Sequence, residues 1–293
     1  MKKLDHPYEC LPGGMWLRGN LHAHTTRSDG RHTGQAVIDD YAGRGYDFLA
    51  LTDHDVFTSD QDYGDLDSRG MTMIPGNEIS ANGCHLLHLD GDRRIEPHRD
   101  RQKVIDDVAG TAGFVIVNHP NWQMDFNHCP LENLVAWQGY AGIEIFNGIV
   151  NGMSGSGYSL AKWEMLLAAG RRVWGYAHDD SHAEGQVELG WNVVYTADRS
   201  RGAIVAALRS GSFYASTGVT ITSIQVEGMR IRIETENACR IRATQLSNAL
   251  LALADDRVME IQVPDEVPYV RFECWGAGER FAWTQPFWVA EGV

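Results

Sequence analysis

The sequence predicts a two-part α/β protein: a repeated strand–helix region followed by a smaller β-rich module. Short apolar runs alternate with amphipathic stretches over the first two-thirds of the 293 residues, which is typical of βα units on a mostly parallel sheet. From about Ser216 apolar and polar residues alternate with a period of two, as in half-buried strands. The chain length fits one large and one small domain. We therefore expect domains at residues 1–215 and 216–293.

The expected elements of the first region follow in chain order. The apolar runs predict strands at residues 15–22, 46–52, 72–79, 85–89, 113–118, 142–147, 172–177 and 191–196. Helical periodicity lies between them at residues 34–45, 100–113, 130–139, 158–170 and 201–211. Several of these stretches end at a glycine, as helices commonly do. The glycine- and serine-rich residues 151–159 predict a loop, which could cover a site.

In the second region the alternating segments predict strands at residues 230–236, 239–245, 258–264 and 269–275. Residues 246–254, "LSNALLALA", are the one helix candidate among them. A sheet that alternates in this way has one buried face, so we expect a sandwich-like module.

Composition excludes several classes of protein. With 43% hydrophobic and 22% charged residues the chain is globular. A formal charge of −14 argues against binding of long nucleic acid, which needs clustered Lys and Arg. No 18-residue apolar run is present, so no membrane partner is expected. The odd number of scattered cysteines, without a CxxC pair, favours a reduced, cytoplasmic setting; they are Cys10, Cys84, Cys129, Cys239 and Cys274.

Histidines and acidic residues, which can bind metal ions, follow the ends of the expected strands. They are Asp53, His54, Asp55, Glu78, His119, Glu144, His178, Asp179, Asp180 and His182. In parallel βα architectures the carboxyl ends of the strands meet at one rim, so these residues would become neighbours. His22 and His24, at i and i+2 on an extended segment, would point to the same face.

This clustering predicts metal binding. Carboxylates and imidazoles crowded into a desolvated pocket are costly without a cation, and divalent metals remove that cost. Nitrogen and oxygen donors without thiolate suit Zn, Mn, Fe or Ni better than Ca or Mg. About ten candidate ligands imply more than one ion, because a single site takes about four to six.

Five motifs in order resemble those of the polymerase and histidinol phosphatase (PHP) superfamily. They are "NLHAHTTRSDG", "LTDHD", "GNEIS" with "HLL", "NHP" and "DDSH", and they span roughly residues 16–183. The resemblance implies a distorted (βα)7 barrel with a trinuclear centre on its C-terminal face. The last strand, "FAWTQPFWV", is similar to that of the carbaryl-hydrolase-type branch of the superfamily.

The resemblance also implies a set of ligands. The first ion would be held by His22, His24, Glu78 and Asp180, the second by Glu78, His85 and His119, and the third by Asp29, His54 and His182. His85 is preferred to His88 because the family's ligand precedes the two leucines. The Asp-x-His spacing favours Asp180 over Asp179 as the ligand. Every position of the set is present here, which argues against a non-catalytic member.

Other residues are candidates for supporting roles. The leaving group could be protonated by Asp55, by His178 or by a metal-bound water. Asp53, Glu144, His178 and Asp179 could orient the ligands by hydrogen bonds, and Arg93 and Arg94 could reach an anionic substrate. Trp122, after "NHP", could form a wall of the pocket. His128 has no motif around it and is expected at the surface.

We expect a metal-dependent phosphoesterase that hydrolyses a small, anionic, phosphorylated substrate by a metal-bridged hydroxide. Two to three divalent ions, Zn, Mn or Fe, would be its cofactors. A carbamate, ester or amide hydrolase is the alternative that keeps the metals and changes the bond. A metal-stabilised binding module is the non-enzymatic alternative. The oligomeric state is left open by the sequence.

Overall fold

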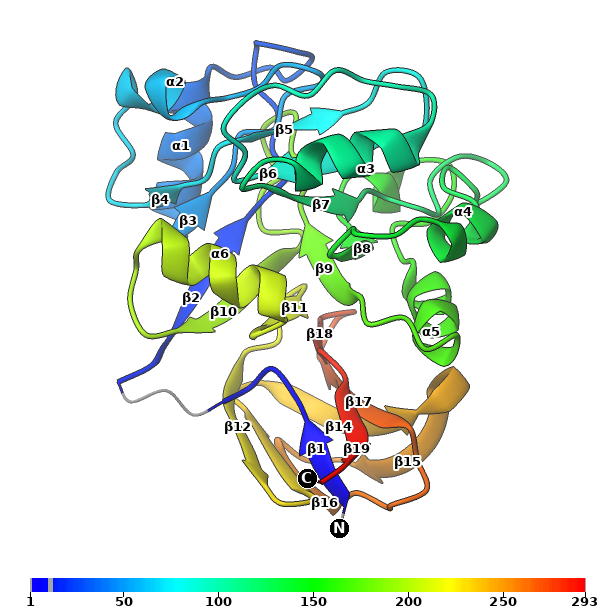
Figure 1. The fold of residues 1–293 in the computed structure, drawn as a ribbon. Helices are drawn as coiled ribbons and strands as arrows, with labels where there is room; N and C mark the ends of the chain where they lie inside the picture. Colours follow the sequence, from blue (N-terminus) through cyan, green and yellow to red (C-terminus); the bar gives the residue numbers. More distant parts are fainter. Residues whose placement is uncertain (1, 10–12, 293) are drawn as a thin grey trace.

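The protein folds into a mixed α/β region and a β-rich region, which lie one above the other in Figure 1. The computed structural model describes residues 2–9 and 13–292, so Cys10 lies outside the described residues. The other four cysteines are free. No helix among the described residues is both long and apolar enough to cross a membrane.

The helices of the first region lie within the predicted ranges. They are α1 Gly34–Gly43, α2 Asp60–Gly64, α3 Arg101–Ala109, α4 Leu131–Ala136, α5 Leu160–Ala168 and α6 Arg201–Ser210; α2 has no counterpart among the predicted ranges. Their ends follow ordinary capping chemistry. The Thr33 side chain accepts from the Ala36 amide at the start of α1, and Gly211, at φ 84°, ends α6 in a left-handed conformation.

The strands of this region are short. They are β2 Met15–Asn20, β3 Phe48–Leu49, β4 Thr72–Met73, β5 Gly76–Ile79, β6 Leu86–Leu89, β7 Phe114–Val117, β8 Gly142–Asn147, β9 Trp174–His178, β10 Trp191–Thr196 and β11 Phe213–Ser216. The one strand predicted at residues 72–79 is two strands, β4 and β5. Pro75 separates them, since proline has no backbone N–H for a ladder.

The arrangement is less parallel than the sequence predicts. The strands β2, β3 and β4 are parallel, and so are β7, β8 and β9. In contrast, β6 is antiparallel to both β5 and β7, and β10 is antiparallel to β2. Residues 80–85 between β5 and β6 are too few for a crossover, which needs about a dozen residues or more.

Two groups of strands surround the centre of the first region. One contains β2, β3 and β4, and the other runs from β5 to β9. Single parallel bridges join their edges at Ala23–Ser181 and at His54–Glu78. Among the described residues the ladders do not form one closed sheet, so the closed (βα)7 barrel stays a prediction.

The β-rich region contains the strands that follow Ser216 together with the first strand of the chain. They are β1 Lys2–Asp5, β12 Ile221–Glu227, β13 Arg230–Thr235, β14 Ala238–Gln245, β15 Ala249–Ala254, β16 Val258–Gln262, β17 Tyr269–Gly276, β18 Phe281–Thr284 and β19 Phe287–Glu291. The sheet of β12, β13 and β16 packs against the other strands over a core that includes Ile231, Ile233, Ile241 and Phe272.

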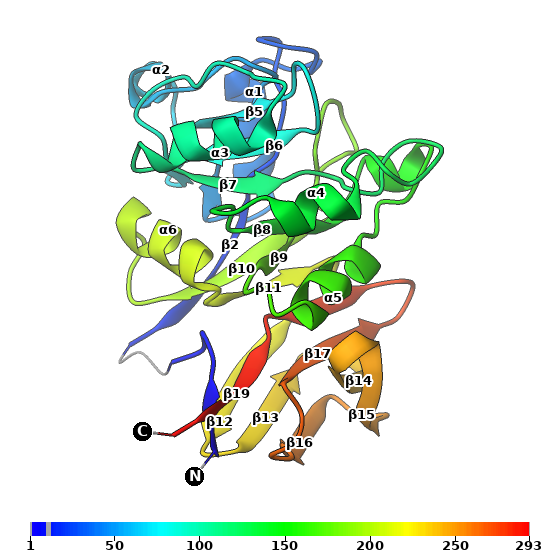
Figure 2. The same ribbon diagram turned by 45° about the vertical axis from the view of Figure 1, so that its right-hand side comes forward.

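The two regions share one sheet. Strand β11 pairs with β10 on one side and with β18 on the other, and β1 pairs with β19 along its whole length. Both termini therefore lie at the same end of the molecule, as Figures 1 and 2 show. The division at residues 1–215 and 216–293 stays a prediction.

The expected helix at residues 246–254 is wrong. Leu246–Asn248 form a short 3-10 turn (η2), and Ala249–Ala254 form strand β15, which pairs with β14. Leucine and alanine favour helices locally, but β14, which directly precedes these residues, offers them a ladder of backbone hydrogen bonds. Hairpin pairing across Leu246–Asn248 therefore overrides the helical preference.

Candidate metal centre

The strand ends converge on one cavity of about 330 Å³. Seven of the nine predicted metal ligands line it: Asp29, His54, Glu78, His85, His119, Asp180 and His182. The other two, His22 and His24, are buried and contact the Asp180 carboxylate. A larger cavity of about 540 Å³ lies beside α6, but the described residues that line it include only two candidate ligands, His6 and Glu9.

The Asp180 carboxylate lies between the first two histidines. Its Oδ1 atom is 3.1 Å from His22 Nε2 and 3.1 Å from His24 Nε2. Asp180 follows β9, and the bridge between Ala23 and Ser181 brings this segment beside the end of β2. By contrast, the neighbouring Asp179 points away from these histidines and accepts from Asn20 and Tyr41.

Glu78 is the central carboxylate of the site. Its Oε1 atom lies 3.4 Å from His22 Nε2, 3.1 Å from His85 Nδ1 and 3.2 Å from His119 Nε2. Its Oε2 atom lies 2.7 Å from His54 Nδ1. One carboxylate thus contacts candidate ligands from several strand ends.

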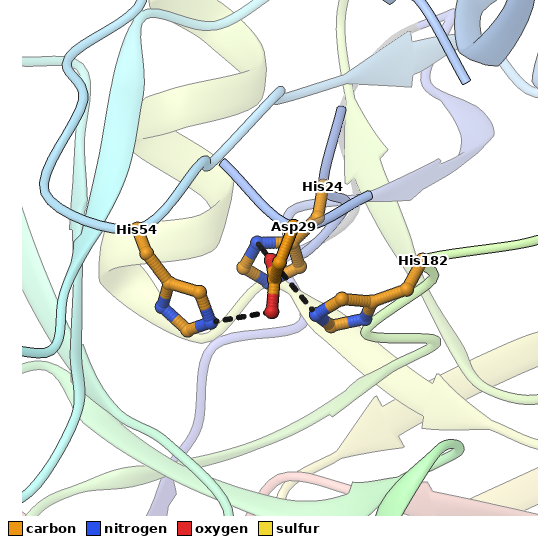
Figure 3. A group of neighbouring side chains, drawn as sticks. All are labelled: His24, Asp29, His54 and His182. Atoms are coloured by element: carbon orange, nitrogen blue, oxygen red, sulfur yellow. Dashed lines mark ion pairs between the residues drawn. The ribbon is translucent and has the colours of Figure 1, made fainter. Parts of the chain in front are cut away.

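A second cluster surrounds Asp29. Figure 3 shows its carboxylate among His24, His54 and His182. The distances from the Asp29 oxygens are 3.7 Å to His24 Nδ1, 3.6 Å to His54 Nε2 and 3.4 Å to His182 Nε2. Asp29 has a side chain that is 57% exposed, so this cluster lies on the open side of the site.

The donor atoms themselves indicate a cation. His22 Nε2, His24 Nε2, Glu78 Oε2 and Asp180 Oδ1 are buried and make no hydrogen bond among the described residues. Buried polar atoms without partners cost several kcal/mol in total, at about 1–3 kcal/mol each. The donor atoms of His22, His24 and Asp180 lie within 4.8 Å of one another, and Glu78 Oε2 lies 3.7 Å from His24 Nε2, so divalent ions would satisfy them. The residues present therefore fit a metal cluster.

The electrostatics agree with this interpretation. Burial raises the pKa of Glu78, but the neighbouring His85 and His22 outweigh burial and hold the pKa well below its usual value. Burial lowers the pKa of His22, yet Asp180 and Glu78 raise it well above the ordinary value. The site thus attracts positive charge, which protons supply when metal ions do not.

Glu144 holds candidate ligands in place by hydrogen bonds. Its Oε1 atom is 2.7 Å from His22 Nδ1 and 2.8 Å from His178 Nδ1. Its Oε2 atom accepts from the His119 amide at 2.6 Å and from Asn147 at 2.9 Å. A carboxylate at Nδ1 fixes the ring so that Nε2 of His22 faces the centre.

Asp53 and Asp179 also hold the site in shape. Asp53 accepts from the amide and hydroxyl of Thr25, each at 2.8 Å, and from the Ser28 hydroxyl at 2.7 Å. It thereby fastens the turn that carries Asp29. Asp179 accepts from the amides that follow Glu188, at 2.7 and 2.9 Å, and thus anchors the loop between β9 and β10.

The two predicted proton donors and the two predicted arginines also lie outside the cavity lining. Asp55 accepts from the Ser80 amide and hydroxyl and from the Ala81 amide, and His178 is buried against Glu144. Arg93 and Arg94 are exposed and pair with their near neighbours Asp92 and Glu96.

The structure shows where two further histidines, His88 and His128, lie. His85 lies in the cavity, whereas His88 is buried outside it against Phe57. His128 was expected at the surface, which is wrong: it is half-buried, with its ring 4.7 Å from that of His85 and 5.0 Å from that of His119. No strand end or spacing in the sequence marks His128, because a loop brings it there.

Asn118 is a residue that sequence reasoning missed. Its side-chain amide donates to Glu78 Oε1 at 2.6 Å, and its oxygen accepts from the Leu87 amide at 3.1 Å. Its position at the end of β7, directly before His119, was the available signal. The residue links the central carboxylate to the neighbouring strand β6.

One solved structure resembles the whole chain. It is a two-domain protein from Bacteroides vulgatus that contains a predicted PHP-like metal-dependent phosphoesterase; the TM-score is 0.57 at 17% identity, over 99% of this chain and 91% of that one. The chain has a PHP-like fold. No protein-family model matches the sequence, and no curated protein matches it significantly.

Two further structures match parts of this PHP-like fold more weakly. PsfC from Pseudomonas syringae has a TM-score of 0.45 at 17% identity, over 67% of this chain and 88% of its own. An amidohydrolase from Chromobacterium violaceum has a TM-score of 0.40 at 17% identity, over 57% and 88% of the two chains. Scores at this level support no argument about the site.

Proposed function

We propose that the protein is a metal-dependent phosphoesterase that hydrolyses a small phosphorylated substrate. The observation that carries this proposal is the convergence of carboxylates and imidazoles, several without hydrogen bonds, on one small cavity. The PHP-like fold supports it, since the similar two-domain protein contains a predicted phosphoesterase. We also propose that the strands around the cavity form the distorted barrel implied by the PHP resemblance.

The proposed centre holds two to three divalent ions, Zn, Mn or Fe, in the sets that the motifs imply. The first set is His22, His24, Glu78 and Asp180, the second is Glu78, His85 and His119, and the third is Asp29, His54 and His182. The short distances within each set and the central place of Glu78 support this division. Ions of this kind supply an activated water and polarise phosphoryl oxygens.

The chain's own residues prepare the site for that chemistry. Glu144 accepts a hydrogen bond from the Nδ1–H of His22, which leaves Nε2 free as a ligand. Asp53 fixes the turn of Asp29 through Thr25 and Ser28. The contacts of Asp55 and His178 keep both side chains out of the cavity lining. We therefore propose that water supplies the proton that the leaving group takes up.

A carbamate, ester or amide hydrolase is the second candidate. It is favoured by the apolar side of the cavity, formed by Trp122, Ile149, Val150 and Met153, and by the resemblance of the last strand to the carbaryl-hydrolase-type branch. Both candidates use the same ligands and differ in the bond that is cleaved. A binding module without catalysis is less favoured, because the ligand set is complete.

The proposal is tested by metal analysis and activity together. We expect two or three metal ions per chain in protein purified without chelator, and turnover of phosphate monoesters after Mn or Zn is added. His54→Ala and Glu78→Ala should each lose metal and at least a hundredfold of activity, whereas exposed His98→Ala should change neither. Full turnover in both site variants, or turnover of carbamates alone, would overturn the proposal.

A further inference from the structure

One wall of the cavity is apolar and is built from two loops. Trp122 comes from the loop after β7, and Ile149, Val150 and Met153 come from the segment after β8. The Trp122 ring lies edge-on to His119 and to His85, with ring centres 5.2 and 5.6 Å apart. A large aromatic surface therefore stands beside the proposed metal ligands.

Backbone hydrogen bonds join the two loops into one wall. The Gln123 amide donates to Ser154 O at 3.1 Å, and the Ser156 amide donates to Asn121 O at 2.9 Å. An antiparallel bridge pairs Trp122 with Gly155 between them. Main-chain hydrogen bonds thus join the two loops that form the wall.

No lysine or arginine is among the described residues that line the cavity. Three cations of adjoining segments, Lys162, Arg101 and Arg27, make hydrogen bonds outside the cavity lining. Lys162 donates to Pro120 O and Cys129 O at 2.8 and 2.7 Å. Arg101 donates to the backbone oxygens of Cys84 and His98 at 2.8 and 3.0 Å, and Arg27 donates to Thr58 Oγ1 at 3.1 Å.

These features restrict the substrate. One phosphoryl group can be bound on the ligand side, where metal ions supply positive charge. A second anionic group would meet no cation and would lie near the carboxylates of Asp29, Glu78 and Asp180. The cavity of about 330 Å³ is at the small end of ligand pockets, which are about 300–1,000 Å³.

We propose that the substrate is a phosphate monoester of an apolar alcohol, aromatic or branched, whose organic group rests against Trp122 and Met153. This inference rests on the proposed function. In the reaction a water oxygen bonds to phosphorus and the bond from phosphorus to the alcohol oxygen breaks. The alcohol takes up a proton from that water, so the products are the free alcohol and inorganic phosphate.

The first test compares two monoesters whose alcohols have similar acidity, so that intrinsic reactivity does not decide the result. With Zn- or Mn-loaded protein, kcat/KM for 2-phenylethyl phosphate should exceed that for glycerol 3-phosphate at least tenfold. Trp122→Ala should remove most of this preference by raising KM, with little change in kcat, and Trp122→Phe should keep it. Equal kcat/KM values for the two esters in the wild type would overturn the inference and leave the phosphoesterase function in place.

A second test needs no turnover. Calorimetric titration of the metal-loaded protein should show phenylphosphonate binding about tenfold more tightly than methylphosphonate. Met153→Ala should reduce this difference, and Met124→Ala, at a methionine that is 86% exposed outside the cavity, should not. If the preference is present without hydrolysis of any monoester, the apolar subsite stands and the proposed function fails. If the two phosphonates bind equally, the subsite is refuted.

Discussion

Glu144 shows at the scale of single residues how much of the proposed centre depends on a side chain that touches no substrate. It accepts four contacts, from His22, His178, the His119 amide and Asn147. In Glu144→Gln the new NH2 group would face at least one of these donors. We expect metal affinity to fall about 10- to 100-fold while the fold is retained, as is usual for such supporting groups. Competition with a chromogenic chelator measures this, and exposed Glu132→Gln serves as the control; unchanged affinity would contradict the role.

His88 gives a prediction about pH. Burial lowers its pKa from 6.5 to about 4. Between these values the unfolded chain binds a proton at this residue and the folded chain does not, so stability falls as pH drops from about 6.5 to about 4. The slope from one such group approaches ~1.4 kcal/mol per pH unit. In chelator-treated protein, urea unfolding over this range should show a shallower pH dependence for His88→Leu than for the wild type. Parallel curves would show that His88 does not contribute.

Whether a residue could be assigned to the site from the sequence depended on which face of a strand end its side chain occupies. The motifs marked Glu78 and Asp180, which the structure places at the centre. Asp55 and His178 have the same local pattern, yet contacts with Ser80 and Glu144, distant in the chain, hold them away from the cavity. A strand end alone does not fix the direction of a side chain once the chain leaves the pleat, as the positive φ of 54° at Asp55 shows.

At the scale of elements, the junction between the two wall loops depends on Gly155. A Cβ atom there would lie 2.4 Å from Asn121 O, and the residue has a φ of 103°, a conformation that L side chains rarely adopt. We expect Gly155→Ala to open the junction and to speed hydrogen exchange of the Gln123 and Ser156 amides at least tenfold. Gly152→Ala, in the same segment but with no atom within 4 Å of the added Cβ, should leave both amides protected. Equal protection in the two variants would show that the bridge is not what joins the loops.

Helices and strands of the first region were predictable because their apolar periodicity is strong and their ends have clear glycine and proline signals. The direction of pairing was not predictable in the same way. The antiparallel β5, β6 and β7 follow from a connection that is too short for a crossover. Strand β15 was not predicted because its leucines and alanines favour a helix, whereas it forms a hairpin with the preceding β14.

At the scale of the whole molecule, a buried ion pair links the two regions. Arg271 of β17 is 1% exposed; its Nε donates to Glu164 of α5 at 2.9 Å, and its Nη1 donates to Glu273 at 2.8 Å. Arg271→Met would leave Glu164 buried without its cation, which should lower the free energy of unfolding by ~3–5 kcal/mol. Exposed Arg257→Met is the matched control. Guanidinium unfolding monitored by tryptophan fluorescence measures both; a loss of less than ~1 kcal/mol would contradict this role of the pair.

Several strands of the β-rich region were predictable from its alternating pattern, but their connections to the rest were not. The sequence "KKLD" at residues 2–5 has no strong strand signal, and it becomes strand β1 only because β19 offers it a partner. The same holds for the pairing of β11 with β18 across the predicted boundary. Contacts between residues so far apart in the chain leave no local pattern.

The pairing of β1 with β19 has a consequence for protein engineering. Lys2 and Glu291 are register partners and form an ion pair at 2.6 Å, so a short peptide can connect the two ends of the described fold. New ends could then be opened at the turn between β12 and β13, where Gly228 has a φ of 60° and is exposed. Exposed turns of this kind tolerate cleavage of the chain. A circular permutant of this design would keep every strand that surrounds the metal ligands uninterrupted.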